Sequence, residues 1–171
     1  MNTDKKEAKM ELRGENEIVF TRYFNAPVSL VFDCHTKPEL MRKGLIGPEG
    51  MVLETCEHDL RVGGKYLYLY MDEKGNKSGV YGTFKEVIVP EKVSNTENYI
   101  MDFSIFDRDA PEDQNATVES RTFTKEGSFT LMTHVYTYPS AEVRKFMIEC
   151  GAADGMSECY LELDKLLISI A

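Results

Sequence analysis

Several features that would assign a chain to a protein class at once are missing from this sequence. It has no tryptophan, and no stretch approaches the ~20 consecutive apolar residues that a membrane span requires. Its first residues are polar and lack the apolar core of a secretory signal. We therefore expect a soluble, cytoplasmic protein that has no membrane partner.

Positive charge is also scarce. The 171 residues carry 29 acidic and 20 basic side chains, which gives a formal net charge of −9, and no local block of basic residues offsets it. A field of this sign repels phosphate backbones and anionic lipid surfaces. Nucleic acid is therefore not an expected partner.

Short motifs for common cofactor and catalytic sites are absent as well. There is no Gly-x-Ser-x-Gly, no phosphate-binding loop and no dinucleotide fingerprint. Gly63 and Gly64 precede a predicted strand, so no helix N-terminus is available there for a phosphate. The four cysteines lack the spacing of a disulfide framework or a structural zinc site, and we expect reduced thiols, no metal and no cofactor.

What the sequence does contain is a long series of strand patterns. Residues 17–24 alternate in polarity, and two short helices are predicted next, one from Val28 and one after the capping-box spacing of Thr36 and Glu39. Six further strands are predicted at residues 51–58, 65–71, 79–88, 93–103, 116–124 and 128–138. Short turns between them favour an antiparallel sheet.

The pattern changes to a helical period at Ser140, which can cap a helix. An apolar stripe then runs to residue 170 and predicts one long C-terminal helix. Gly151 and Gly155 lie inside it, where each predicts a bend or a close approach to the sheet. We expect residues 1–14 to form a disordered tail and residues 15–171 to form a single domain.

Three ordered stretches resemble a known family. They are Phe24-Asn25-Ala26-Pro27 with Thr36-Lys37-Pro38-Glu39-Leu40, Asp59-Leu60-Arg61-Val62-Gly63-Gly64 with Gly82-Thr83-Phe84, and Pro139-Ser140-Ala141-Glu142 with Gly155-Met156. The chain resembles the activator-of-heat-shock-protein-90-ATPase homologue family of the START-like (SRPBCC) superfamily. The resemblance implies an α+β helix-grip fold, in which a curved seven-stranded antiparallel sheet wraps around a long C-terminal helix, with two short helices after the first strand. Tryptophans usual in that family are replaced here, one of them by Met156, so its ligand preference does not carry over.

The helix-grip fold places a pocket between the sheet and the C-terminal helix, and strand parity suggests its walls. Tyr66, Tyr68 and Tyr70 share one strand face, and a few hydroxyls in an apolar concavity are typical of a small-molecule site. Equally, they can be core aromatics whose hydroxyls reach water or backbone. The predicted ligand-binding residues are Phe32, Tyr66, Tyr68, Phe84, His134, Tyr136, Met156 and Tyr160.

The other face of the same strand is also apolar, with Leu67, Leu69 and Met71. A strand that is apolar on both faces indicates that its outer face is covered too. A homodimer in which a second subunit supplies the cover is one hypothesis.

Three functions remain open. The leading interpretation is a binding module for a small apolar or amphipathic molecule, without covalent chemistry. The resemblance implies a second, a co-chaperone whose partner is heat-shock protein 90. The third is an enzyme, such as a cyclase or hydrolase acting on an aromatic or polyketide-like substrate, for which His134 is the best general-base candidate. A lone histidine near tyrosines is more often structural, so the enzyme hypothesis requires a His, Glu or Asp that converges with the tyrosines.

Overall fold

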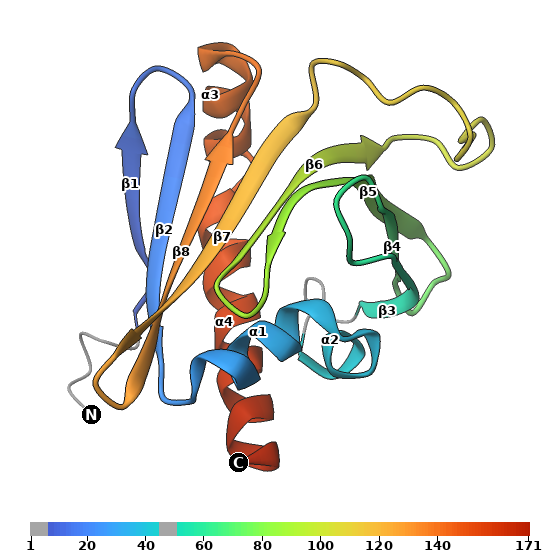
Figure 1. Ribbon diagram of the computed structural model, residues 1–171. Coiled ribbons are helices and arrows are strands. Elements are labelled where there is room, and N and C mark those ends of the chain that lie inside the picture. Colours follow the sequence, from blue (N-terminus) through green and yellow to red (C-terminus); the bar gives the residue numbers. More distant parts are fainter. Residues whose placement is uncertain (1–6, 45–50) are drawn as a thin grey trace.

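The framework of the molecule is one antiparallel sheet that curves around the C-terminal helix (Figure 1). The computed structural model describes residues 7–44 and 51–171. In chain order its elements are β1 (Lys9–Arg13), β2 (Glu17–Phe24), α1 (Val28–Thr36), α2 (Pro38–Gly44), β3 (Val52–His58), β4 (Lys65–Met71), β5 (Lys77–Ile88), β6 (Lys92–Ile100), β7 (Thr117–Glu126), β8 (Phe129–Thr137), α3 (Ala141–Glu149) and α4 (Ala152–Ile170). The strand order is β1-β2-β8-β7-β6-β5-β4-β3, and every neighbouring pair is antiparallel.

The helix-grip fold is therefore confirmed, but the sheet has eight strands where seven were predicted. The additional strand, β1, lies within the segment predicted to be a disordered tail, and it pairs with β2 from Lys9↔Thr21 to Arg13↔Glu17. All five of its side chains are exposed, so the segment shows none of the alternating burial that a hydrophobic pattern detects. The first six residues of the predicted tail lie outside the described residues.

The two short helices after β2 form as predicted, although not with the predicted cap. Thr36 is the last residue of α1, and its hydroxyl donates to the carbonyl oxygen of Phe32 at 2.9 Å instead of capping α2. Lys37 is extended between the helices, as expected for a residue that precedes a proline. At the end of α2, a Cβ added to Gly44 would lie 2.7 Å from Cδ2 of Leu166 on α4, so a larger residue there would displace the Leu166 side chain.

The single C-terminal helix predicted over residues 140–170 is divided in two. The hydroxyl oxygen of Ser140 accepts a hydrogen bond from the Val143 amide at 3.2 Å and caps α3, as expected. Gly151 then adopts the left-handed conformation, with φ of 83°, and α4 begins at the next residue. Gly155 makes no close approach, because a Cβ there would meet no atom within 4 Å.

α4 packs inside the curve of the sheet, with α1 and α2 toward one end and α3 at the other (Figure 1). Its buried residues Tyr160, Leu163 and Leu167 join a core that also contains Phe24 of β2 and Phe84 of β5. Burial of these large side chains removes apolar surface from water and supplies the main stabilisation of the fold. Within the described residues, no helix has both the length and the apolar character needed to cross a membrane.

Candidate ligand-binding site

Three of the predicted wall residues lie together on the concave face of the sheet, opposite α4. Tyr66 and Tyr68 of β4 project inward, and their ring centroids are 4.7 Å apart. Phe84 of the neighbouring strand β5 lies 5.5 Å from the Tyr66 ring. The alternation of β4 therefore places its tyrosines on the inner face.

Four more of the predicted residues form a second group, between β8 and α4. The rings of His134 and Tyr136 are 4.3 Å apart on β8. Across from them, the Tyr136 hydroxyl donates to the sulfur of Met156 at 3.5 Å, and the Tyr160 hydroxyl lies 3.4 Å from His134 Nδ1. These contacts hold α4 against the inner face of the sheet.

Two polar residues that the sequence analysis missed connect the groups. Glu119 of β7 binds His134 Nε2 at 2.7 Å through one oxygen and accepts from Asn95 Nδ2 at 2.7 Å through the other. The same Asn95 amide is 3.1 Å from the Tyr66 hydroxyl, which donates to the Thr96 carbonyl oxygen at 2.6 Å. A continuous series of hydrogen bonds therefore runs from β4 through β6 and β7 to β8.

A buried cation, Arg121, completes this cluster. Its Nη2 donates to Asn95 Oδ1 at 3.1 Å and lies 3.5 Å from Glu119 Oε1. The side chain is only 9% exposed, and its Nε has no hydrogen-bond partner among the residues that the structure describes. Arginine is always charged, so this buried N–H remains a donor at every physiological pH.

The protonation states follow from these contacts. Burial by itself raises the pKa of Glu119, but Arg121 and the hydrogen bond from His134 outweigh burial and hold that pKa well below its usual range. Burial lowers the pKa of His134 in spite of its acidic neighbour, so the ring is neutral near pH 7. Because an ionised carboxylate only accepts, Nε2 carries the ring proton and Nδ1 is left to accept from Tyr160.

Phe32 is the predicted wall residue that the structure does not bring to this cluster. It lies on α1, is 2% exposed, and packs edge-on against Phe123 of β7 with ring centroids 5.6 Å apart. That contact belongs to the core beneath α1. The sequence did contain one indication that Glu119 and Arg121 face inward. They lie four and two residues before the aromatic Phe123 on the same strand, so all three side chains point to the same face of the sheet.

Partly accessible side chains surround the cluster toward the end of the sheet that leads into α3. They are Tyr70, Glu97, Tyr99, Tyr136 and Met156. Burial, and then the negative charge of Glu119, raise the pKa of Glu97 to about 8. Glu97 is therefore mostly protonated near neutral pH, whereas Glu119 is ionised.

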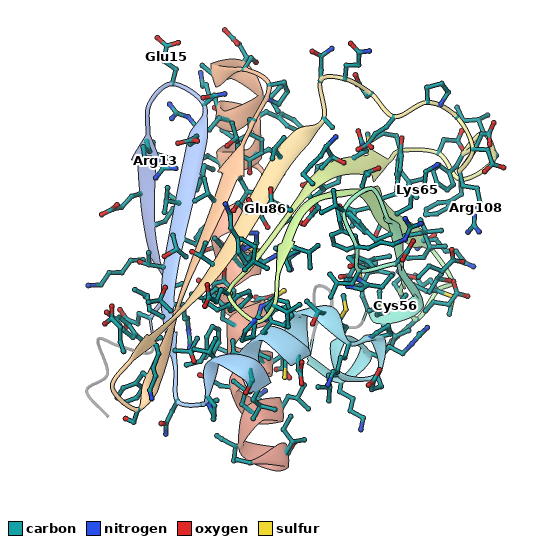
Figure 2. The ribbon with its side chains drawn as sticks, viewed as in Figure 1. Arg13, Glu15, Cys56, Lys65, Glu86 and Arg108 are labelled. Carbon is teal, nitrogen blue, oxygen red and sulfur yellow. The ribbon has the colours of Figure 1, made fainter. Side chains whose placement is uncertain are left out.

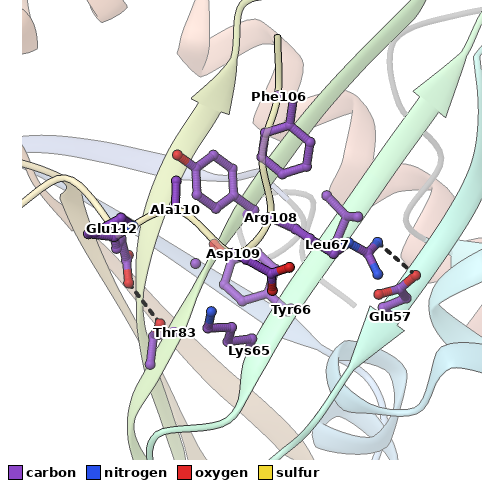
Figure 3. Close-up of a pocket in the computed structure, with 13 residues that line it drawn as sticks. Glu57, Lys65, Tyr66, Leu67, Thr83, Phe106, Arg108, Asp109, Ala110 and Glu112 are labelled. Carbon is purple, nitrogen blue, oxygen red and sulfur yellow. Dashed lines mark hydrogen bonds and ion pairs between the residues drawn. The ribbon is translucent and has the colours of Figure 1, made fainter. Parts of the chain in front are cut away.

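A separate pocket lies on the outer face of β4 and β5, under the loop of residues 101–116 that joins β6 to β7 (Figure 3). The loop is attached at Glu112, which accepts from Thr83 Oγ1 at 2.7 Å and from Asn98 Nδ2 at 2.9 Å. The loop also covers the outward-facing Leu67, which is 7% exposed. The same chain therefore covers the part of the outer β4 face around Leu67. The homodimer that was suggested as a cover for this face stays a prediction.

Neither site contains a cluster suited to metal. Across residues 7–44 and 51–171, no group of three or more His, Cys, Asp or Glu side chains is arranged to hold an ion.

Comparison with known proteins identifies what this architecture is similar to. The model of the family described as "Activator of Hsp90 ATPase homolog 1-like protein" matches residues 25–168. Among solved structures, a Rhodobacter sphaeroides protein is 20% identical with a TM-score of 0.84, over 96% of this chain and 99% of its own. Protein Ms6760 from Mycobacterium smegmatis is 27% identical with a TM-score of 0.77, over 95% and 96% of the two chains. An AHSA1-like protein from Aeromonas hydrophila is 14% identical with a TM-score of 0.63, over 86% and 94%. No curated protein matches the chain in sequence.

Proposed function

The chain belongs to the activator of Hsp90 ATPase homolog 1-like family, and from this premise we propose that it binds a small apolar or amphipathic molecule between the concave face of its sheet and α4. The observation that carries the proposal is the buried polar cluster of Glu119, Arg121 and His134 among aromatic and apolar side chains. Small-molecule sites combine mostly apolar walls with a few precisely placed polar groups, and this surface has that composition.

Stability alone gives no reason for such a cluster. Two charges lose their hydration when they are buried, and an apolar core of the same volume is often equally stable or more stable. The unpartnered Nε–H of Arg121 adds a further cost, because a buried donor without an acceptor destabilises a fold by about 1–3 kcal/mol. An oxygen atom of a ligand at that position would remove the cost.

The charges of the cluster also favour a neutral ligand. Glu119 and Arg121 offset each other, His134 is neutral near pH 7, and Glu97 is mostly protonated. A carboxylate brought into this surface would add a net negative charge in a low dielectric, where it is poorly stabilised. We therefore place the polar oxygen of a neutral, amphipathic ligand near Arg121 and its apolar body along Tyr66, Tyr136 and Met156.

Binding can be tested with the neutral, apolar dye N-phenyl-1-naphthylamine, whose fluorescence rises in an apolar environment. Met156→Trp enlarges a side chain on the α4 wall and is expected to weaken binding of the dye at least about tenfold, since overpacking a filled site costs about 1–3 kcal/mol. The matched control is Ile168→Trp, at a position on α4 that is 76% exposed, and it should leave binding unchanged. Binding that is the same in all three proteins would place the dye elsewhere and contradict the proposal.

A second measurement does not depend on the choice of dye. Native mass spectrometry of the purified protein is expected to show an added mass that is lost on denaturation, because unfolding separates the sheet from α4 and releases a ligand held between them. Arg121→Met, with a volume close to that of the arginine stem, should reduce the occupied fraction. If neither the dye nor any added mass binds to the wild-type protein, the binding hypothesis fails.

The convergence of Glu119, His134 and Tyr160 supports a second candidate, acid–base catalysis on the bound molecule. A carboxylate that fixes the tautomer of a histidine leaves the other ring nitrogen unprotonated and able to act as a base. In His134 this atom is Nδ1, which faces the Tyr160 hydroxyl at 3.4 Å. Hydrolysis of 4-nitrophenyl butyrate that is lost in His134→Gln and kept in Glu91→Gln, an exposed control, would support the enzyme. No hydrolysis by the wild-type protein would remove a hydrolase from consideration.

The description of the family supplies a third candidate, a co-chaperone that raises the ATPase rate of heat-shock protein 90. A steady-state ATPase assay with the purified chaperone tests it directly. Stimulation that saturates with added protein would support this role, and no stimulation would end it.

A further inference from the structure

The outer pocket lies on the opposite face of the sheet from the concave site, because successive residues of a strand point to opposite faces, although Tyr66 contributes to the lining of both. Leu67 and Tyr81 line the outer pocket, whereas their strand neighbours Tyr68 and Val80 point toward α4. The volume of the pocket is about 330 Å³, which lies in the range of small-molecule sites. Figure 2 places two of its residues, Lys65 and Arg108, together at one end of the molecule.

One part of this pocket is apolar. The ring centroids of Tyr81 on β5 and Phe106 on the covering loop are 5.0 Å apart, with the rings inclined at 56°. Leu67, which the loop almost completely covers, lies beside them. Two tilted rings and an aliphatic side chain provide a surface on which a third ring can pack edge-to-face or offset.

Three charged residues of the lining are already matched within the protein. Arg108 Nη2 lies 3.1 Å from Glu57 Oε1 on β3 and forms an ion pair with it. On the other side, Glu112 accepts hydrogen bonds from Thr83, Thr96 and Asn98. These contacts attach the loop at both ends of the pocket and leave little for a ligand to gain from either group.

Two further charges of the lining are not matched. Lys65 on β4 and Asp109 on the loop make no ion pair, with each other or with any other residue in the part of the chain that the structure describes. Figure 3 shows the Lys65 ammonium and the Asp109 carboxylate on different walls, both directed at the cavity. A cation and an anion that face one cavity from different walls are complementary to a molecule that carries both charges.

The total charge of the lining limits which net charge a ligand of this pocket can carry. Glu57, Asp109 and Glu112 are negative, while Lys65 and Arg108 are positive, so the pocket has an excess of one negative charge. Together with the net charge of −9 on the whole chain, this repels phosphates and other polyanions. A ligand without net charge is not repelled.

We propose that this outer pocket is a second binding site, and that it takes a small zwitterion with an aromatic side group, of the chemical class of the aromatic α-amino acids. The carboxylate of the ligand pairs with Lys65 and its ammonium group pairs with Asp109. The ring packs against Phe106 and Tyr81.

The test compares L-phenylalanine with 3-phenylpropanoate, which lacks the ammonium group, and with phenethylamine, which lacks the carboxylate, by titration followed with two-dimensional ¹⁵N–¹H NMR. L-Phenylalanine is expected to bind with millimolar affinity and about threefold to fivefold more tightly than either singly charged analogue, because solvent-exposed ion pairs contribute modestly. Shifts should be confined to the loop of residues 101–116 and to β4 and β5.

Two substitutions test the contributions of Lys65 and Asp109 one at a time. Lys65→Met should abolish the advantage of L-phenylalanine over phenethylamine, and Asp109→Asn should abolish its advantage over 3-phenylpropanoate. Both side chains are exposed, so the variants are expected to fold, and Lys74→Met serves as a control on an exposed turn. Met156→Trp, which tests the concave site, should leave binding of L-phenylalanine unchanged, so the two proposals succeed or fail separately.

Equal affinity for the three ligands, no saturable shift at millimolar concentration, or shifts at Tyr136 and Met156 in place of the loop would each overturn the proposal.

Discussion

At the scale of single residues, the described part of the chain buries charge at two places on the inner face of the sheet. One is the Glu119–Arg121 pair, and the other is Arg22, which is 1% exposed beneath α4. Arg22 binds Asp164 through both terminal nitrogens, at 2.6 and 3.3 Å, and its guanidinium lies 4.8 Å from the centre of the Phe24 ring. This bidentate geometry fixes the position of α4 along β2 as well as its distance from the sheet.

Asp164→Ala is expected to lower the free energy of unfolding by about 3 kcal/mol, because it leaves the buried Arg22 without a counterion. The exposed pair between Glu162 and Lys165 lies on the same helix and provides the control. Glu162→Ala should cost less than about 1 kcal/mol. Urea denaturation measures both, and equal losses would show that the Arg22 charge is not held by Asp164.

The carboxyl of Glu97 makes stability depend on pH. Its pKa is raised to about 8 in the folded protein from 4.5, first by burial and then by Glu119, so the folded state binds more protons between these values. The contribution of Glu97 to the free energy of unfolding therefore falls as pH rises from about 4.5 to 8. Glu97→Gln should be more stable than wild type by at least about 1 kcal/mol above pH 8 and nearly equal to it at pH 4.5, as measured by thermal unfolding.

Glu91→Gln, which changes an exposed carboxyl, should follow the wild-type protein at both pH values. An advantage for Glu97→Gln that does not change with pH would mean that Glu97 is ionised in the folded protein.

At the scale of elements, the division between α3 and α4 depends on one residue. Gly151 has a φ of 83°, which is unfavourable for any residue with a side chain, while nothing lies within 4 Å of the place where a Cβ would be. The chain can therefore turn there without a packing contact to hold it. None of the α3 side chains is buried, and its Phe146 is 62% exposed.

Two alanine substitutions are expected to have opposite effects. Gly151→Ala should destabilise the protein by about 1–2 kcal/mol, because alanine is strained in the left-handed conformation. Gly155→Ala, four residues later within α4, should stabilise it by up to about 1 kcal/mol, because the helix is regular there and has room for the methyl group. Unfolding by urea gives both values, and two changes of the same sign would contradict the helix boundary.

The elements show what the sequence could and could not predict. β8 was predicted because burial of its inner face imposes alternation on its residues, whereas β4, which is apolar on both faces, was predicted from a short run rich in tyrosine between two turn signals. β1 was missed because it buries no side chain, and the break at Gly151 was only one of two interpretations that a glycine in a helix allows. Tyr66 and His134 were found from strand parity, whereas Glu119 and Arg121 were missed because charged residues usually face solvent.

At the scale of the whole molecule, the sheet separates two candidate sites of different character. The concave site is mostly apolar, and its buried charges offset each other, whereas the outer pocket has exposed charges of both signs. The chain as a whole has a net charge of −9. Self-repulsion at this charge destabilises the compact state and is screened by salt.

Raising NaCl from about 0.02 M to about 0.5 M should therefore increase the melting temperature by a few degrees. The double variant Glu15→Lys/Glu73→Lys changes two exposed side chains and the net charge from −9 to −5, since each substitution adds two positive charges. Its melting temperature should depend less on salt. A wild-type protein that loses stability in salt would indicate that its exposed ion pairs outweigh the repulsion.

The exposed strand β1 affects how the sheet can associate with other chains. Its five side chains are exposed and add nothing to the core, yet its backbone occupies the hydrogen-bonding groups along the free side of β2. A strand whose edge groups are open is a template on which another chain can extend the sheet. β1 carries Lys9, Glu11 and Arg13 at alternate positions, so the new edge presents charges to any approaching strand. In this way a short charged strand keeps the edge of β2 from pairing with another chain, which reduces the tendency of the protein to aggregate.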